Sequence, residues 1–237
     1  MPSNASFFAP SMSVSDSPLR SYYAARAPEY DSVYSKPERQ PDLRAIEHWL
    51  RTRFAGATAL EVACGTGYWT QFIAPSAALV VAVDAAPETL RIARARVPGE
   101  NVAFIVGDAY ALPADLGEFS AAFAGFWFSH VPKARQREFL LGVGARLQPG
   151  STVVLLDNLF VPGSSSAISD QDADGNTYQT RSLRNGSIHR VLKNFPTDAE
   201  LQAAIAGLGT SGTFIRWEYF WAFEYISTRG SLHPEGL

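Results

Sequence analysis

Cysteine and charged residues are both scarce in this 237-residue chain. Cys64 is the only cysteine, which excludes an intramolecular disulfide or a cysteine zinc cluster and favours a reducing compartment, so we expect a cytoplasmic protein. Residues 1–18 contain no Lys or Arg and only one apolar pair, Phe7-Phe8. They predict neither a signal peptide nor a membrane anchor, and we expect a disordered leader.

Charged residues make up 18% of the chain, against about 25% in an average soluble domain. The 23 Asp and Glu residues outnumber the 20 Lys and Arg residues, so the net charge is −3 and a nucleic-acid partner is disfavoured. Hydrophobic residues are 46% of the chain, which is enough for a core. The length fits one large domain, which we place at residues 19–237.

From residue 43 to residue 157 the chain alternates short apolar strands with amphipathic helices. Strands are expected at residues 59–63, 79–83, 102–106, 121–126 and 152–156, and helices at residues 69–74, 87–96 and 133–147. Aromatic and apolar residues at helical spacing predict two further helices between residues 19 and 52. The alternation predicts an α/β fold, doubly wound, with helices on both faces of a mainly parallel sheet.

Glycine or a carboxylate follows each of the first three strands. Gly65 and Gly67 form a turn that opens a helix, and Asp84 and Asp108 end the second and third strands. Ligands of such sheets bind at these strand ends, where bare backbone and carboxylates suit the ribose and adenine of a nucleoside. The alternatives are a tight turn without a ligand, a helix N-cap at Asp84 and a turn former at Asp108.

This glycine turn departs from the dinucleotide fingerprint, because Thr70 stands where that fingerprint has a third small residue. The motif Glu61-x-Ala63-x-Gly65-x-Gly67 instead resembles motif I of the class I S-adenosylmethionine-dependent methyltransferases. The resemblance covers about residues 43–157 and continues through Asp84, Asp108-Ala109, Phe119–Phe123, His130–Pro132 and Leu147–Gly150. Ala63 replaces the first glycine of the family, and we expect its φ to be negative.

The resemblance implies a Rossmann-like seven-stranded sheet that ends in an antiparallel pair, with an N-terminal helical cover at residues 19–52. The second strand of that pair comes from the insertion after strand five or from a break near Glu218-Tyr219. The implied cofactor is S-adenosylmethionine, with S-adenosylhomocysteine as product, and Glu61 would hold its methionine amino group directly or through water. The expected cofactor-binding residues are Glu61, Ala63, Gly65, Gly67, Asp84, Ala85, Asp108, Ala109 and Phe126.

Methyl transfer from a sulfonium requires alignment but no metal and no covalent nucleophile. His130, after strand four, has a near-neutral ordinary pKa and is the candidate catalytic residue, with capping of a backbone group as the alternative. The candidate substrate-binding residues are Tyr22, Tyr23, Trp127, Asn158 and Arg181. For the tyrosines the alternative is helix packing, and for Trp127 it is burial in the core.

Residues 160–195 form a polar insertion after strand five, which we expect to act as a lid and to determine the substrate. Asn185-Gly186 predicts a hairpin, and a two-residue loop would place Arg181 opposite Arg190. That face would then receive an acidic group, unless the register differs. The run Asp170–Asn176 resembles half a calcium loop, but Arg181 occupies its twelfth position, so we expect a solvated turn and no metal site.

The sequence thus favours a single-domain methyltransferase that acts on a small molecule, with the accepting atom left open among O, N, S and C. One alternative is an RNA or protein methyltransferase, which would need a basic patch made by Arg181, Arg184, Arg190 and Lys193. A second is a non-catalytic module that binds S-adenosylmethionine. A third is a nicotinamide-dependent reductase.

Overall fold

The computed structural model of the chain describes residues 26–228, without the side chains of residues 27–30. The expected leader, Tyr22 and Tyr23 lie outside the described residues. Within residues 26–228, no helix has the length and apolar character needed to cross a membrane.

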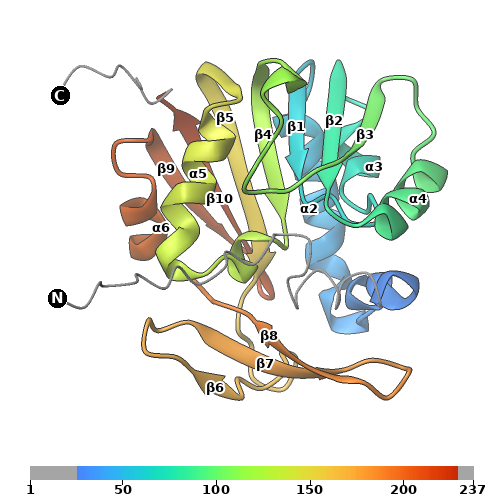
Figure 1. Ribbon diagram of the computed structural model, residues 1–237, viewed down its shortest axis with the longest axis vertical. Helices are drawn as coiled ribbons and strands as arrows, with labels where there is room; N and C mark the ends of the chain where they lie inside the picture. The colour runs from blue at the N-terminus through green and yellow to red at the C-terminus, as the bar shows by residue number, and fades with distance from the viewer. Residues whose placement is uncertain (1–25, 229–237) are drawn as a thin grey trace, which may run out of the picture.

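A seven-stranded sheet in the order β3-β2-β1-β4-β5-β10-β9 forms the centre of the molecule (Figure 1). Its strands are β1 (Thr58–Val62), β2 (Leu79–Asp84), β3 (Val102–Val106), β4 (Phe119–Gly125), β5 (Leu147–Asn158), β9 (Gly209–Arg216) and β10 (Phe220–Ser227). The first five are parallel, and β10 runs antiparallel between β5 and β9. The predicted doubly wound α/β fold is confirmed, and the terminal pair arises from a break at residues 217–219.

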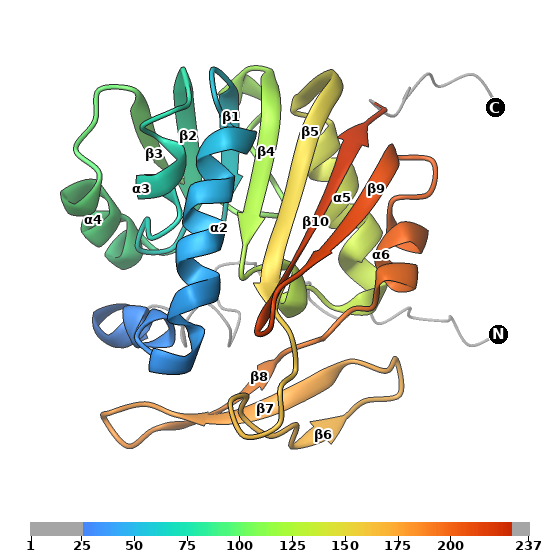
Figure 2. The same ribbon diagram turned by 180° about the vertical axis from the view of Figure 1, so that it is seen from behind.

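Helices cover both faces of this sheet: α2, α3 and α4 lie on one face, and α5 and α6 lie on the other (Figures 1 and 2). The α-helices are α2 (Gln40–Arg53), α3 (Thr70–Ile73), α4 (Pro87–Arg96), α5 (Gln136–Gly144) and α6 (Asp198–Ala204). The 3-10 helices are η2 (Ala27–Tyr34), η3 (Pro37–Arg39), η4 (Ala114–Leu116), η5 (Phe128–His130) and η6 (Lys133–Arg135). The segment before α2 is therefore 3-10 helical instead of α-helical.

The helix expected at residues 133–147 ends at Gly144, three residues early. Gly142 and Gly144 weaken its last turn, because glycine has a low helix propensity. Leu147 is fully buried and pairs with Phe119 of β4, so it opens β5. Packing against the sheet thus overrides the helical spacing.

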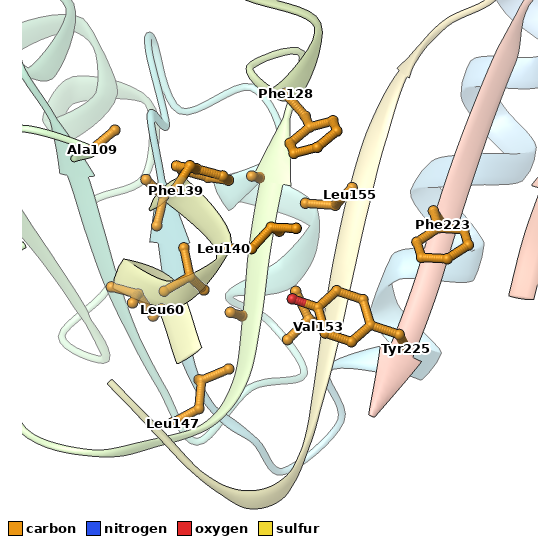
Figure 3. Packing of buried hydrophobic residues seen from close by; sticks show 14 of the residues in the cluster. Leu60, Ala109, Phe128, Phe139, Leu140, Leu147, Val153, Leu155, Phe223 and Tyr225 are labelled. Atoms are coloured by element: carbon orange, nitrogen blue, oxygen red, sulfur yellow. The ribbon is translucent and has the colours of Figure 1, made fainter. Parts of the chain in front are cut away.

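Two buried apolar clusters fix the sheet between the helix layers. On one face Phe139 and Leu140 of α5 pack against Leu60 and Leu155 of the sheet (Figure 3). Each fully buried Leu or Phe side chain stabilises the fold by roughly 1.5–3 kcal/mol. This packing holds the carboxyl ends of β1 to β5 in a fixed arrangement.

A separate three-stranded sheet lies beneath the carboxyl ends of the parallel strands, as both views show (Figures 1 and 2). It consists of β6 (Asp170–Gln171), β7 (Thr177–Ser182) and β8 (Ile188–Leu192), all within the predicted insertion. The ring of Phe160 meets that of Phe195 edge-on at 5.3 Å, where the insertion leaves and rejoins the main sheet.

The hairpin around Asn185-Gly186 is confirmed, and of the two alternatives the different register is the one observed. Leu183 and Ser187 are hydrogen-bonded across a three-residue loop in which Gly186 has φ +81°. Arg181 therefore pairs with His189 instead of Arg190. A one-residue shift moves side chains to the opposite face of a strand, so the two arginines point away from each other.

Candidate active site

The turn between β1 and α3 contains three residues with left-handed backbone: Ala63 (φ +57°), Gly65 (φ +55°) and Gly67 (φ +73°). The expected negative φ at Ala63 is wrong, because the chain must reverse direction directly after β1 to begin α3. The Cβ atom makes this conformation cost roughly 1–2 kcal/mol at Ala63. A Cβ at Gly67 would lie 3.0 Å from the Cβ of Ala93, so α4 packs directly against the turn. We call residues 63–67 the glycine turn.

Glu61 is a buried carboxyl beneath the glycine turn, only 2% exposed. Its Oε2 accepts a hydrogen bond of 2.7 Å from the Thr70 hydroxyl. Burial raises the pKa of Glu61 to about 8, and the nearby Asp84 adds to this effect. A cation beside Glu61 would stabilise its ionised form, so the site suits an ammonium group.

Asp84, at the end of β2, bonds to the glycine turn and to the start of α4. Its Oδ2 accepts the Gly65 N–H at 2.8 Å, and its Oδ1 accepts the Ala86 N–H at 2.9 Å and the Thr89 hydroxyl at 3.0 Å. Burial raises the pKa of Asp84, while these three hydrogen bonds oppose the shift. A carboxylate has about four lone-pair positions, so one remains for a ligand hydroxyl. The half-buried Ala85 lies between these partners.

Asp108 ends β3 in a tight turn, where its Oδ1 accepts the Tyr110 N–H at 2.9 Å. This is the turn-forming role considered above, and it uses one of the two carboxylate oxygens. Ala109 is buried in the core cluster beside the turn. At Gly107 a Cβ would lie 2.8 Å from Val83, so β2 and this turn are in close contact.

The N-terminal 3-10 segment lies against the glycine turn. Asp31 accepts a hydrogen bond of 2.7 Å from the Thr66 hydroxyl and forms an ion pair with Arg96 of α4. The ring of Tyr34 stacks on Tyr68, with ring centroids 3.5 Å apart. The segment is thus attached to the turn by polar and aromatic contacts.

β4 ends in a strained residue, because Phe126 has φ +58°. Its buried ring stacks between those of Tyr34, at 5.5 Å, and Phe220, at 5.8 Å. A Cβ at Gly125 would lie 2.7 Å from the Trp69 ring, which leaves no room for another residue there. Non-glycine residues in this conformation are uncommon and gather at functional sites.

His130 is 4% exposed and hydrogen-bonds through Nδ1 to the Leu192 carbonyl of β8. A carbonyl only accepts, so Nδ1 carries the proton and the lone pair is on Nε2. Burial lowers the pKa of His130 well below its ordinary value, and the positive charges of Lys193 and Arg181 lower it further. The imidazole is therefore neutral at physiological pH.

A buried ion pair joins the insertion to the end of β5. Lys193 is 3% exposed, forms an ion pair with the fully buried Asp157 and donates a 2.7 Å hydrogen bond to the Ser129 hydroxyl. Burial lowers the pKa of Lys193 to about 8, although Asp157 opposes the shift. Asp157 also accepts the Asn158 N–H at 2.7 Å. This network positions the ends of β4, β5 and β8 relative to one another.

Arg39, at the start of α2, is 4% exposed and reaches the same strand end. Its Nη1 donates to Asn158 Oδ1 at 2.8 Å, and its Nε donates to Ser164 Oγ at 3.1 Å. Ser164 in turn donates to Glu38 at 2.9 Å. The guanidinium lies 5.6 Å from the Tyr219 ring centroid. Among the described residues, no carboxylate lies within ion-pair distance of Arg39.

These strand ends surround a cavity of about 350 Å³, which we call the cationic cavity. It is lined by Arg26, Ser32, Val33, Lys36, Arg39, Phe126, His130, Asn158, Ser164, Ser165, Ser166, Gln179, Thr180, Arg181, Ser182, Leu183, Lys193 and Phe195. Five of these residues are basic, and none is Asp or Glu.

Comparison with known proteins agrees with this geometry. Residues 59–150 match a methyltransferase domain family. Two solved structures of DhpI cover nearly the whole fold: its complex with SAH is 28% identical, with a TM-score of 0.70, and covers 89% of this chain and 95% of DhpI. The complex titled DhpI-SAM-HEP is 29% identical, with a TM-score of 0.72, over 88% and 95%. The chain contains a class I S-adenosylmethionine-dependent methyltransferase domain.

Curated relatives match a part of this methyltransferase domain. An uncharacterized methyltransferase of Synechocystis is 32% identical over 102 residues, which are 43% of this chain and 47% of the relative. A demethylmenaquinone methyltransferase of Lactococcus lactis is 31% identical over 109 residues, which are 43% and 42%. The chain thus spans about half the length of the curated relatives it matches. The PH0226 protein of Pyrococcus horikoshii, at 19% identity and a TM-score of 0.65 over 81% and 92%, shares the fold.

The structure brings many of the predicted site residues of the methyltransferase domain together. Glu61, Ala63, Gly65, Gly67, Asp84, Ala85, Asp108 and Ala109 lie along the ends of β1, β2 and β3. Phe126, His130, Asn158 and Arg181 line the cationic cavity. Trp127 is not among the lining residues and packs 6.2 Å from the Tyr110 ring. The calcium-like run is a turn in which Asp172 accepts hydrogen bonds from Asn176 and Tyr178.

Sequence reasoning missed Arg39, Lys36 and Ser164 as cavity residues. Arg39 and Ser164 are 125 positions apart, and no local pattern links them. The RNA or protein alternative would need Lys193 in a basic patch, but this residue is buried against Asp157. The one sequence signal for its position is that side chains alternate between the two faces of a hairpin. In the observed register this alternation puts Lys193 on the same face as Arg181, but the register has to be known first.

Proposed function

We propose that the chain transfers a methyl group from S-adenosylmethionine to a small-molecule acceptor bound in the cationic cavity. The observation that carries this proposal is the position of the cavity at the carboxyl ends of β4 and β5, next to the 3-10 segment whose Asp31 bonds to Thr66 of the glycine turn. Phe126 lines the cavity and contacts Tyr34, which stacks on Tyr68 at the turn. Open α/β sheets bind their ligands at such strand ends.

The residues around the glycine turn fit the cofactor. We assign the buried Glu61 to its ammonium group, the remaining lone pair of Asp84 to a ribose hydroxyl, and Asp108 to the adenine amino group. Gly65 and Gly67 are buried residues without a Cβ atom, which allows the nucleoside to approach their backbone closely. When bound, the cofactor supplies an electrophilic methyl group on a positively charged sulfur.

In this proposal the chain acts mainly by alignment. With the cofactor bound, an electron pair of the acceptor would attack the methyl carbon, and the carbon–sulfur bond would break to leave a neutral thioether. The cavity walls hold the acceptor in line with that bond and exclude water. The hydrogen bond at Nδ1 fixes the orientation of the His130 ring and leaves the lone pair on Nε2. We assign Nε2 as the base that takes the proton from the hydroxyl, amine or thiol being methylated.

The charge distribution favours a small molecule over RNA or protein. An RNA track requires basic side chains aligned on one open face. Arg190 is instead paired with Asp170 on the outer face of the hairpin, Lys193 is buried, and Arg181 lines the cavity. The cavity also disfavours a non-catalytic module, which would need no acceptor site. With the single buried thiol of Cys64, we retain a cytoplasmic location as part of this proposal.

The test is incubation of the purified protein with fractionated metabolite extract and methyl-labelled S-adenosylmethionine. We expect one low-molecular-weight compound to gain the label, together with release of S-adenosylhomocysteine. Calorimetry with S-adenosylhomocysteine provides the independent measurement of cofactor binding. Binding without any labelled small molecule would support the non-catalytic module, and label in RNA or protein would support that alternative.

A further inference from the structure

The cationic cavity concentrates positive charge, and among the described residues no carboxylate lines it. Its Lys and Arg residues come from three separate parts of the chain: the N-terminal segment with Arg26, Lys36 and Arg39, β7 with Arg181, and the residue after β8, Lys193. Asp157 neutralises Lys193 from behind. At least three further cationic groups therefore face a space of about 350 Å³.

The hydrogen bonds of Arg39 go to neutral groups, and the carboxylates of Glu38 and Asp42 act on its charge only from beyond ion-pair distance. The side-chain partners of the guanidinium are the neutral Asn158 and Ser164. Glu38 lies on the far side of Ser164 and bonds to its hydroxyl. Buried charges are normally paired, because removal from water is costly. A guanidinium that is 4% exposed at a cavity wall is suited to bind an anion from the cavity side.

Arg181 and Lys36, which come from different parts of the chain, also donate to neutral groups. Arg181 donates through Nε and Nη2 to the neutral side-chain amide oxygen of Gln179, with the shorter bond at 2.8 Å. Lys36 donates to the Ser164 carbonyl. Burial lowers the pKa of Lys36 and that of Lys193. The charge of Arg39 adds to the shift at Lys36 and the charge of Arg181 adds to it at Lys193, while Glu38 and Asp157 oppose it. These effects show that like charges lie close enough to repel, and an anion between them would reverse that repulsion.

The three consecutive serines Ser164–Ser166 line the same wall. The hydroxyl protons of Ser164 and Ser165 are already donated to Glu38 and to the Leu159 carbonyl, so the arginine forks are the groups that match the oxygens of a carboxylate, phosphate or phosphonate. An apolar or cationic acceptor would not compensate the charges of the two guanidinium groups.

We propose that the acceptor of this methyltransferase carries an oxyanion group, and that Arg39 and Arg181 bind that group in the cationic cavity. This inference rests on the proposed function, and it names the chemical class of its substrate. Arg39 sets the position of the oxyanion relative to β5 through Asn158. Arg181 supplies a second cation from the hairpin, so the insertion selects acceptors by charge.

The experiment measures binding of inorganic phosphate, acetate and neutral glycerol to protein saturated with S-adenosylhomocysteine. We expect phosphate or acetate to bind and glycerol not to bind, and the stronger anion identifies phospho-group or carboxylate recognition. Arg181→Gln should weaken anion binding about tenfold or more. Arg190→Gln, whose arginine pairs with Asp170 outside the cavity, is the matched control and should leave binding unchanged. Arg39 is buried, so Arg39→Gln can also lower the stability of the fold, and its binding result is compared with its unfolding curve. The decisive variant is therefore Arg181→Gln.

The outcome separates this inference from the proposed function. Failure to bind S-adenosylhomocysteine, or absence of any methylated small molecule, would overturn the proposed function itself. Cofactor binding with methylation of a neutral compound, at a KM that Arg181→Gln does not change, would overturn only the oxyanion inference. Anion binding that is equally strong in Arg181→Gln and Arg190→Gln would also overturn it.

Discussion

The guanidinium of Arg39 donates a 2.8 Å hydrogen bond to the side-chain oxygen of Asn158, and so joins the start of α2 to the end of β5. The two residues are 119 positions apart. Between them lies the alternating part of the domain that carries the glycine turn. The bond therefore brings the N-terminal segment to the strand end where the acceptor is proposed to bind, and both parts of the site depend on one arrangement of the sheet.

The affinity for S-adenosylhomocysteine should depend on pH through Glu61. In the free protein its pKa is raised to about 8, so the carboxyl is protonated below that pH. Binding of an ammonium group requires the ionised form, and affinity should rise by up to about tenfold per pH unit below 8 and level off above it. Calorimetry from pH 6 to 9 measures this. Glu61→Gln should give weaker, pH-independent binding, and an unchanged slope in that variant would contradict the assignment.

The same group determines a pH dependence of stability in the free protein. The pKa of Glu61 in the folded state lies above its ordinary value of 4.5. Its contribution to stability is therefore complete below pH 4.5 and decreases as pH rises through about 8. Other groups titrate as well, so the relevant measurement is the difference in unfolding free energy between Glu61→Gln and the natural protein across this range.

Replacing Asp84 by Ala should weaken both cofactor binding and folding. Two donors, the Gly65 N–H and the Ala86 N–H, lose their acceptor, while the Thr89 hydroxyl keeps its 2.7 Å bond to the Ala86 carbonyl. A buried donor without a partner costs about 1–3 kcal/mol, so the loss of unfolding free energy should exceed that of Asp108→Ala, which releases the Tyr110 N–H. Calorimetry and urea unfolding check the two effects. An unchanged dissociation constant for S-adenosylhomocysteine would remove Asp84 from the ribose site.

The Lys193–Asp157 pair should show strong coupling in a double-mutant cycle. Either Lys193→Met or Asp157→Asn leaves a buried charge without its partner and should cost about 3–5 kcal/mol of unfolding free energy. The double variant should cost much less than the sum of the two single variants. The exposed Arg190–Asp170 pair is the control, since such pairs contribute about 0–1 kcal/mol. Additive losses at the buried pair would show that the charges act independently.

Substitution of His130 tests its assignment as proton acceptor. His130→Ala should lower kcat by about 10²–10⁴-fold at saturating cofactor and acceptor if it removes a proton in the transition state. Because the pKa of His130 is held well below its ordinary value, kcat should show no imidazole titration near neutral pH. His130→Gln keeps a polar group of similar size. Unchanged turnover in either variant would exclude a role in proton transfer.

The arrangement of the residues that we propose for the cofactor was predictable because their sequence signals are local. The glycine turn, Asp84 and Asp108 each follow directly on an apolar strand, and the order of elements fixes which strand ends are neighbours. The boundaries of α4 and β3 also agree with the expected residues. In these segments propensity, hydrophobic period and packing favour the same structure.

The acceptor half was less predictable because long-range pairs form it. Ser164 lies in an irregular segment, and its bond to Arg39 follows from the position of the whole insertion. The hairpin shows how much one residue matters: the three-residue loop at 184–186 places Arg181 and Lys193 on the cavity side and Arg190 outside. Asn-Gly allows more than one loop length, so local sequence alone did not determine that register.

The contact of Asp31 with Thr66 and Arg96 has a kinetic consequence. The 3-10 segment is attached to the glycine turn partly by an ion pair that is accessible to solvent, and dissolved salt weakens such contacts. Release of S-adenosylhomocysteine from beneath this segment should therefore become faster as ionic strength rises. The Lys193–Asp157 ion pair is buried, so salt should affect it little. Turnover limited by product departure would then increase with moderate salt, even as an anionic acceptor binds less tightly.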